Sequence, residues 1–214
     1  MDKFNRISKN FSVLKGFAAL IVMFGHYTHI SNFWVVVTIG MLIFSISSGY
    51  FTYNQYHGSF SWLKYWNRKF RRLVPRLTII YIFLFVLFIM QEKANIWTIH
   101  TAVNLLGMNG ILNWFRIQNL SPFGAGMWFL TLLILFYIFY PLLEKFYRNK
   151  KVSMFFTFLT ILFLYVMSLR VLYSHALWLT ASGFFIGLFL ARIRFSFTKI
   201  FSLIGIVSCS FLML

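Results

Sequence analysis

Seven long apolar runs, separated by charged or turn-forming residues, divide the chain. An α-helix needs roughly 20 apolar residues to cross the hydrocarbon core of a bilayer, and runs of this kind predict membrane-spanning helices. The predicted spans cover residues 11–30, 33–53, 77–90, 126–147, 152–172, 176–191 and 197–214. The expected fold class is all-α, a polytopic transmembrane bundle, and residues 1–214 are expected to form a single domain because no internal repeat or low-complexity linker divides them.

The segment 96–115 is apolar but broken by polar residues and glycines. These interruptions are His100, Asn104, Gly107, Asn109, Gly110 and Asn113. A lipid-exposed span must satisfy its backbone with an unbroken helix, so this pattern favours an interfacial or broken element over a crossing. We expect the segment to enter and leave on the same side of the membrane.

The composition agrees with a membrane protein: 60% of the 214 residues are hydrophobic and only 11% are charged. The net charge of +17 would suggest nucleic acid as a partner in a soluble chain. Here the basic residues must instead be read by their position between spans, and membrane lipids, not nucleic acid, are the expected partner. The carboxylates are Asp2, Glu92 and Glu144.

The distribution of Lys and Arg predicts the topology. With the amino terminus in the cytoplasm, the segments 1–10, 64–76, 145–151 and 192–199 all face the cytoplasm and carry most of the basic residues. Only Lys93, Arg116 and Arg170 then fall outside, as the positive-inside rule requires. The prediction is a multi-pass protein of the cell membrane with a cytoplasmic amino terminus.

The first span contains a lysine near its start and a histidine near its end. Lys15 and His26 are eleven positions apart, about three helical turns, so on a helix they share one face about 16 Å apart. An ionisable group inside a span is costly and marks a candidate functional site. Burial keeps an imidazole neutral, so His26 could act as general base for acyl transfer to an alcohol, with Lys15 nearer the cytoplasm. The alternative is a structural histidine that bonds to a neighbouring helix.

A basic cluster precedes the third span, and Pro75 is expected to mark the point where the chain enters that span. The cluster consists of Lys64, Arg68, Lys69, Arg71, Arg72 and Arg76. The positive-inside rule alone would explain it, with anionic lipid headgroups as its ligands. The functional interpretation is a clamp for the phosphates of a cytoplasmic cosubstrate. No metal-binding spacing, phosphate loop or nucleophile elbow is found, so no bound cofactor or metal is expected.

Four patches resemble the integral-membrane acyltransferase-3 family, in the same order along the chain. They are Lys15 and His26 in LKGFAALIVMFGH; Ser48, Gly49, Tyr50 and Phe51; Lys69, Arg72, Leu73 and Pro75; and Trp128, Phe136, Tyr137 and Pro141 in WFLTLLILFYIFYP. The resemblance implies a bundle of about ten helices, of which this chain would supply about seven. It also implies a cytoplasmic acyl-CoA donor, such as acetyl-CoA, and an extracytoplasmic glycan or lipid-linked sugar as acceptor.

The resemblance assigns catalysis to His26 and Lys15. Substrate binding would involve Arg68, Lys69, Arg72, Arg76, Ser48 and Trp128. One departure is that many members carry paired glutamates where this chain has Leu133 and Ile134. Two other readings stay open: a carrier or flippase for an anionic lipid-linked precursor, and an inactive truncated remnant, which the apolar carboxyl end suggests.

Overall fold

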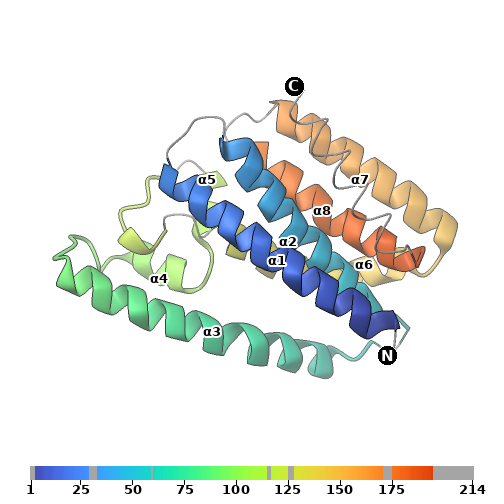
Figure 1. Cartoon of the computed structure of the whole chain (residues 1–214), viewed down its shortest axis with the longest axis horizontal. Coiled ribbons are helices and arrows are strands. Elements are labelled where there is room, and N and C mark those ends of the chain that lie inside the picture. Colours follow the sequence, from blue (N-terminus) through green and yellow to red (C-terminus); the bar gives the residue numbers. More distant parts are fainter. Residues whose placement is uncertain are drawn as a thin grey trace. The chain divides into compact units, whose positions relative to one another are not determined.

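The computed structural model describes residues 3–28, 33–58, 60–114, 117–124, 128–170 and 175–194, and the predicted span 197–214 lies outside them. In these ranges the chain is helical and contains no strand (Figure 1). The helices are α1 (Lys3–Thr28), α2 (Phe33–Tyr56), α3 (Trp62–Met90), α4 (Ile99–Leu105), α5 (Asn109–Trp114), the 3₁₀ helix η1 (Pro122–Gly124), α6 (Trp128–Tyr147), α7 (Lys150–Arg170) and α8 (His175–Arg192). The all-α prediction is confirmed.

Five of these helices are long and apolar enough to cross a membrane, namely α1, α2, α3, α6 and α7. Helix α8 is apolar but shorter. The interrupted segment 96–115 forms the two short helices α4 and α5, which are too short to span a bilayer. The prediction of a broken element is therefore confirmed.

Helix α3 differs from the prediction at its start. The third span was expected to begin near Leu77, after the basic cluster and Pro75, but α3 begins at Trp62 and continues through both. Lys and Arg are good helix formers, so the helix extends ahead of the apolar stretch that marks the span. Its 29 residues measure about 43 Å, more than the hydrocarbon core, and the basic residues occupy its first half.

The chain folds into two compact units, which are described separately here. The first contains Met1–His57 and Glu144–Leu214, and the second contains Gly58–Leu143. Helix α6 contributes its first four turns to the second unit and its last residues to the first. The single-domain assignment of residues 1–214 stays a prediction.

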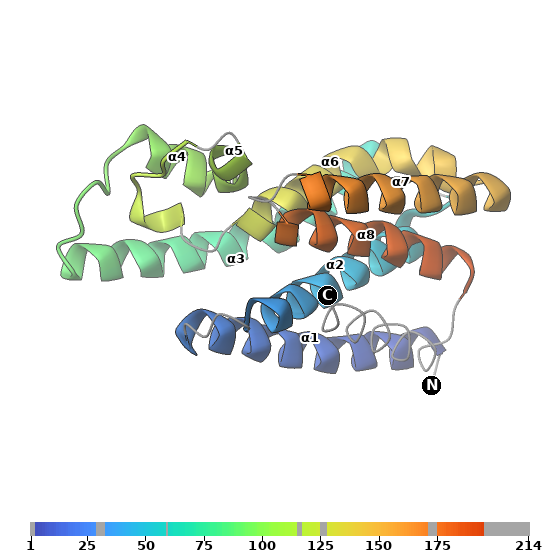
Figure 2. The ribbon, with the colours of Figure 1, turned by 90° about the horizontal axis from the view of Figure 1, so that it is seen from above.

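In the first unit, α2 packs against α1 and α8, and α8 also packs against α7 (Figure 2). Gly183 approaches Leu42 and Gly187 approaches Ile46, so α2 and α8 run in the same direction. Along the chain, α3, α6 and α7 lie between α2 and α8. If each of these three helices crosses the membrane once, α8 crosses in the same direction as α2. A fourth crossing by residues 96–115 would have made α8 antiparallel to α2, so the parallel contact agrees with a segment 96–115 that does not cross.

Small residues bring α2 and α8 together at this contact. Gly183 and Gly187 on α8 face Ser45 and Gly49 on α2, a small-xxx-small pattern on both helices. A Cβ atom at Gly49 would overlap the carbonyl oxygen of Phe184, and one at Gly187 would overlap the carbonyl oxygen of Ile46. The glycines are therefore required by backbone-to-backbone packing. Gly49 belongs to the second motif patch, so this packing fixes the helix that carries it.

In the second unit, one face of α3 turns inward. Its less exposed residues recur every four positions: Tyr65, Lys69, Leu73, Leu77 and Tyr81. At the far end of α3, Tyr81 packs with Ile96 and Phe123 in a small apolar cluster. The turn between α4 and α5 packs against α6, where Gly107 lies close to Leu130 and Ile134.

Candidate functional site

The first two motif patches meet in the first unit. The Lys15 ammonium lies 5.6 Å from the centre of the Phe51 ring, as a cation–π contact. One turn earlier on α1, the buried Phe11 ring packs at 5.4 Å on Tyr50 and 5.3 Å on Phe51. The pairing of α1 with α2 therefore brings Lys15 to the serine-glycine-aromatic end of α2.

Ser48 lies one turn before Phe51 on α2, on the same side of that helix. Its hydroxyl is buried and has no hydrogen-bond partner among the residues that the structure describes. The hydroxyl of Ser45, one turn before Ser48 on α2, is also buried without a partner in the described ranges. Buried hydroxyls normally find a partner, so these two groups could receive a polar ligand or water at the level of Lys15.

His26 lies in α1, which runs unbroken from Lys3 to Thr28, so the helical premise of the Lys15–His26 register is confirmed. The side chain of His26 lies outside the described residues. Its position on the face of Lys15 therefore stays a prediction.

The third and fourth patches meet in the second unit. The Lys69 ammonium lies 3.7 Å from the centre of the Tyr137 ring and 5.5 Å from that of Tyr65. The Tyr65 hydroxyl donates a hydrogen bond of 2.9 Å to the Tyr137 carbonyl, and its ring stacks on Tyr140 at 5.7 Å. These contacts join the first turns of α3 to α6. Trp128, the predicted binding residue on α6, is half-buried at the first residue of that helix.

The basic cluster divides into two groups. Lys69 is partly buried on the inward face of α3, whereas the other members are exposed: Lys64, Arg68, Arg71, Arg72 and Arg76. Exposure suits lipid headgroups or topology, which need no fixed orientation. An inward lysine packed on tyrosine rings has a defined position, so Lys69 is the member best placed for a specific site. The patches thus meet in two pairs, one pair in each unit: Lys15 contacts Phe51 of the second patch, and Lys69 contacts Tyr137 of the fourth.

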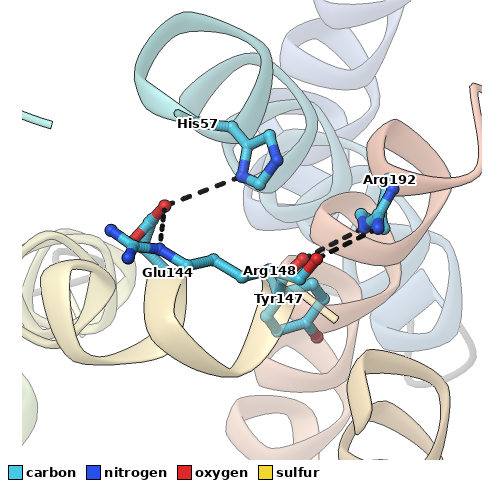
Figure 3. A network of polar contacts seen from close by, with 5 residues as sticks. All are labelled: His57, Glu144, Tyr147, Arg148 and Arg192. Atoms are coloured by element: carbon cyan, nitrogen blue, oxygen red, sulfur yellow. Dashed lines mark hydrogen bonds and ion pairs between the residues drawn. The ribbon is translucent and has the colours of Figure 1, made fainter. Parts of the chain in front are cut away.

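A polar network that the sequence did not predict joins α2, α6 and α8 in the first unit (Figure 3). Its centre is the buried carboxylate of Glu144, which is only 2% exposed. Nε of Arg148 donates to both carboxylate oxygens, at 3.2 and 3.1 Å, and His57 Nδ1 lies 3.7 Å from Oε1. The sequence placed Glu144 in the charged tail that follows the apolar part of its span, and its burial was not expected. His57 lies in the turn just after α2, at the end of that span, as expected.

Arg192 completes this network from the end of α8. Its guanidinium donates hydrogen bonds of 3.1 Å to the carbonyls of Tyr147 and Arg148, at the end of α6. These carbonyls have no partner within their own helix, and a cation at a helix carboxyl end is favourable. The only sequence signals were the i, i+4 spacing of Glu144 and Arg148 and the scarcity of acids. Neither signal identifies helices α2 and α8 as neighbours.

Burial lowers the pKa of the His57 imidazole, whose ring stacks on Tyr53 at 4.3 Å. The Glu144 carboxylate opposes this effect and raises the pKa, whereas Arg192 and Arg148 lower it further. The net direction is downward, so His57 is neutral at pH 7.

His57 should make the stability of the protein sensitive to mild acid. The unfolded imidazole titrates near pH 6.5 and the folded one at lower pH, so below about pH 6.5 the unfolded state binds more protons and stability falls. His57→Gln should flatten this dependence in thermal unfolding scans in detergent between pH 7.5 and 5. Glu144→Gln, which removes the opposing charge, should steepen it. Identical pH profiles for the His57 variant and the wild type would contradict this assignment.

The two positions of the fourth patch where the resemblance would imply paired glutamates are described by the structure. Leu133 and Ile134 lie on α6, and the Ile134 side chain lies against Gly107 in the turn between α4 and α5. In this chain these positions pack apolar groups. Neither of these two positions therefore supplies an acid or a base.

Comparisons with known proteins place these patches in a family. Neither the curated proteins nor the solved structures give a match. The family model Acyl_transf_3, described as an acyltransferase domain, matches residues 8–214. This match includes all four motif patches and both units. The chain therefore belongs to the acyltransferase-3 family of membrane acyltransferases.

Proposed function

We propose that this membrane O-acyltransferase moves an acetyl group from cytoplasmic acetyl-CoA to a hydroxyl of an extracytoplasmic glycan or lipid-linked sugar. The observation that carries the donor side is the inward position of Lys69, over Tyr137 and within a basic stretch of α3. Coenzyme A carries several phosphates, and lysine and arginine are the residues that bind them. Arg72, one turn after Lys69 on α3, would be the second contact.

The reaction needs a base for the acceptor and a leaving group that departs to the cytoplasm. The acceptor hydroxyl oxygen attacks the thioester carbonyl, the new C–O ester bond forms, and the C–S bond breaks. His26 accepts the hydroxyl proton, and the imidazolium then gives this proton to the departing CoA thiolate, so charge and atoms balance. Lys15 and Ser48, which lie at one level of α1 and α2, would orient the thioester end of the donor.

The test of this activity uses the full chain in liposomes with radiolabelled acetyl-CoA and a panel of methyl glycosides of glucose, galactose and rhamnose. Label transferred to a glycoside, with matching release of CoA, supports the proposal. If no glycoside in the panel is labelled, the proposed function is wrong. Movement of a lipid-linked sugar across the bilayer without acetyl-CoA would support a carrier instead.

Lys69→Met should raise the KM for acetyl-CoA by about tenfold or more, because a charge-assisted contact to phosphate contributes about 1.5–3 kcal/mol. The matched control is Arg71→Met, two residues away on the exposed side of α3, which should leave this KM unchanged. Initial rates of CoA release at several acetyl-CoA concentrations measure both. Equal effects of the two substitutions would mean that the cluster acts only through its total charge.

A further inference from the structure

One side of the broken segment α4–α5 is buried in the second unit. The hydroxyl of Tyr81 donates a hydrogen bond of 2.9 Å to the backbone carbonyl of Asn104, on α4. Tyr81 lies nine residues before the end of α3 at Met90, about 14 Å along the helix axis, or about half the hydrocarbon thickness. If α3 crosses the bilayer upright, Asn104 lies close to the membrane midplane. Irregular backbone at this depth is found where it is buried in protein or lines a polar cavity.

Most polar groups of this segment are satisfied by one another. The Thr131 hydroxyl on α6 donates to the Gly107 carbonyl at 2.6 Å and accepts from the Gly110 N–H at 2.9 Å. The hydroxyls of Thr101 and Ser121 lie 2.7 Å apart. The segment is thus held to α6 and to the following loop by a built network.

The side chain of Asn104 is not fully satisfied. It is 1% exposed, its Nδ2 donates to Asn119 Oδ1 at 3.2 Å, and its Oδ1 has no partner in the described part of the chain. Exchanging the amide oxygen and nitrogen of Asn104 would not give this oxygen a donor. Asn119 Oδ1 also accepts the backbone N–H of Ser121, so the atom that faces Asn104 must be an oxygen. The nitrogen of Asn104 therefore faces Asn119, and the oxygen is left over.

The loop that fixes this orientation is itself anchored. The backbone N–H of Leu120 donates to His100 Nδ1 at 3.0 Å, which ties the loop to α4. A buried carbonyl oxygen without a donor is unfavourable, and such a group calls for an explanation. Here the unmatched atom is an acceptor, so its missing partner is a donor such as a hydroxyl.

We propose that Asn104 Oδ1 binds the acceptor substrate, by accepting a hydrogen bond from a carbohydrate hydroxyl that enters from the side of the α3 end at Met90. This inference rests on the proposed function, since it names the acceptor side of the same reaction. A hydroxyl held near the midplane would be placed where a donor arriving from the opposite side can reach it. The segment α4–α5 is then the acceptor-binding element, and Asn104 is a specificity-determining residue in it.

The test compares two near-isosteric substitutions that break the same hydrogen bond. Asn104→Leu removes Oδ1 and the bond to Asn119, whereas Asn119→Leu removes that bond but leaves Asn104 Oδ1 in place. Asn104→Leu should raise the KM for the methyl glycoside that the wild type accepts at least tenfold, and leave the KM for acetyl-CoA unchanged. Asn119→Leu should change the glycoside KM less than threefold. Thermal unfolding in detergent checks that both variants fold.

The outcomes separate this inference from the proposed function. If the wild type labels no glycoside, the proposed function fails and this inference fails with it. If the wild type transfers acetyl but both variants behave alike, Asn104 is only structural and the proposal is wrong while the function stands. Should Asn104→Leu fail to fold, Asn104→Ala, which removes Oδ1 with a smaller side chain, must raise the glycoside KM at least tenfold relative to Asn119→Ala, and a similar KM in these two variants would overturn the proposal.

Discussion

Replacing His26 by alanine should lower the rate of acetyl transfer by roughly a hundredfold to ten-thousandfold, the usual contribution of a general base. Without the imidazole, nothing at this place on α1 accepts the proton of the attacking hydroxyl. The amount of protein in the membrane should not change, because alanine is an excellent helix former and removes a polar group from the span. Transfer of label from acetyl-CoA to a methyl glycoside measures the rate, and membrane fractionation measures insertion.

The matched control is His29→Ala, one turn further along the same segment. It should keep the transfer rate within a few-fold of the wild type if His26 is the base. Binding of acetyl-CoA, measured at equilibrium, should be unaffected in both variants. Unchanged acetylation by His26→Ala would rule out this residue as the base, and insertion failure would assign it a structural role.

Much of the fold could be predicted because a bilayer imposes its dimensions on the sequence. The apolar runs predicted α1, α2, α6 and α7 to within a few residues at most ends. The polar interruptions at Gly107 and Gly110 predicted that the segment 96–115 would not cross, and the parallel contact of α2 with α8 agrees. These features are local in sequence, so periodicity and composition contain them.

Features that depend on contacts between distant helices were not predictable. Glu144 looked like part of a charged tail because it stands beside Lys145 and Arg148, yet its carboxylate is buried next to His57, at the end of α2. Similarly, hydropathy could not show that α3 extends through Pro75, since charged residues lower the apolar score without breaking a helix. Both errors come from treating charge as a sign of solvent.

In the candidate site, too, features that are local in the sequence could be predicted, whereas contacts between distant helices could not. The order of the four patches was visible in the sequence, but not which patches meet. Helix pairing brings Lys15 to Phe51 in one unit and Lys69 to Tyr137 in the other. The inward position of Lys69 also separates it from five similar residues in the cluster, a distinction that charge alone could not make. Spatial pairing therefore gives each patch a partner whose loss can be tested.

Gly187→Ala should lower the free energy of unfolding by about 1–3 kcal/mol, the usual cost of forcing an extra group into a packed interface. The new Cβ would overlap the carbonyl oxygen of Ile46, a backbone atom that cannot turn aside, so α8 and α2 must move apart. Gly49→Ala should have a similar effect through the carbonyl of Phe184. Thermal unfolding in detergent at pH 7.5 measures both.

The matched control is Gly16→Ala on α1, where an added Cβ meets nothing within 4 Å. This substitution should be neutral or stabilise the protein by up to about 1 kcal/mol, because alanine is the better helix former. If Gly187→Ala lowers the free energy of unfolding and Gly16→Ala raises it, the destabilisation comes from the α2–α8 contact, because the chemical change is the same. Because α2 also carries Ser48 and Phe51, Gly187→Ala should reduce acetyl transfer as well. Gly187 lies about one and a half helical turns before Arg192, which holds the end of α8 against the end of α6. A Gly187 variant as stable as the Gly16 variant would show that the two helices do not pack backbone to backbone.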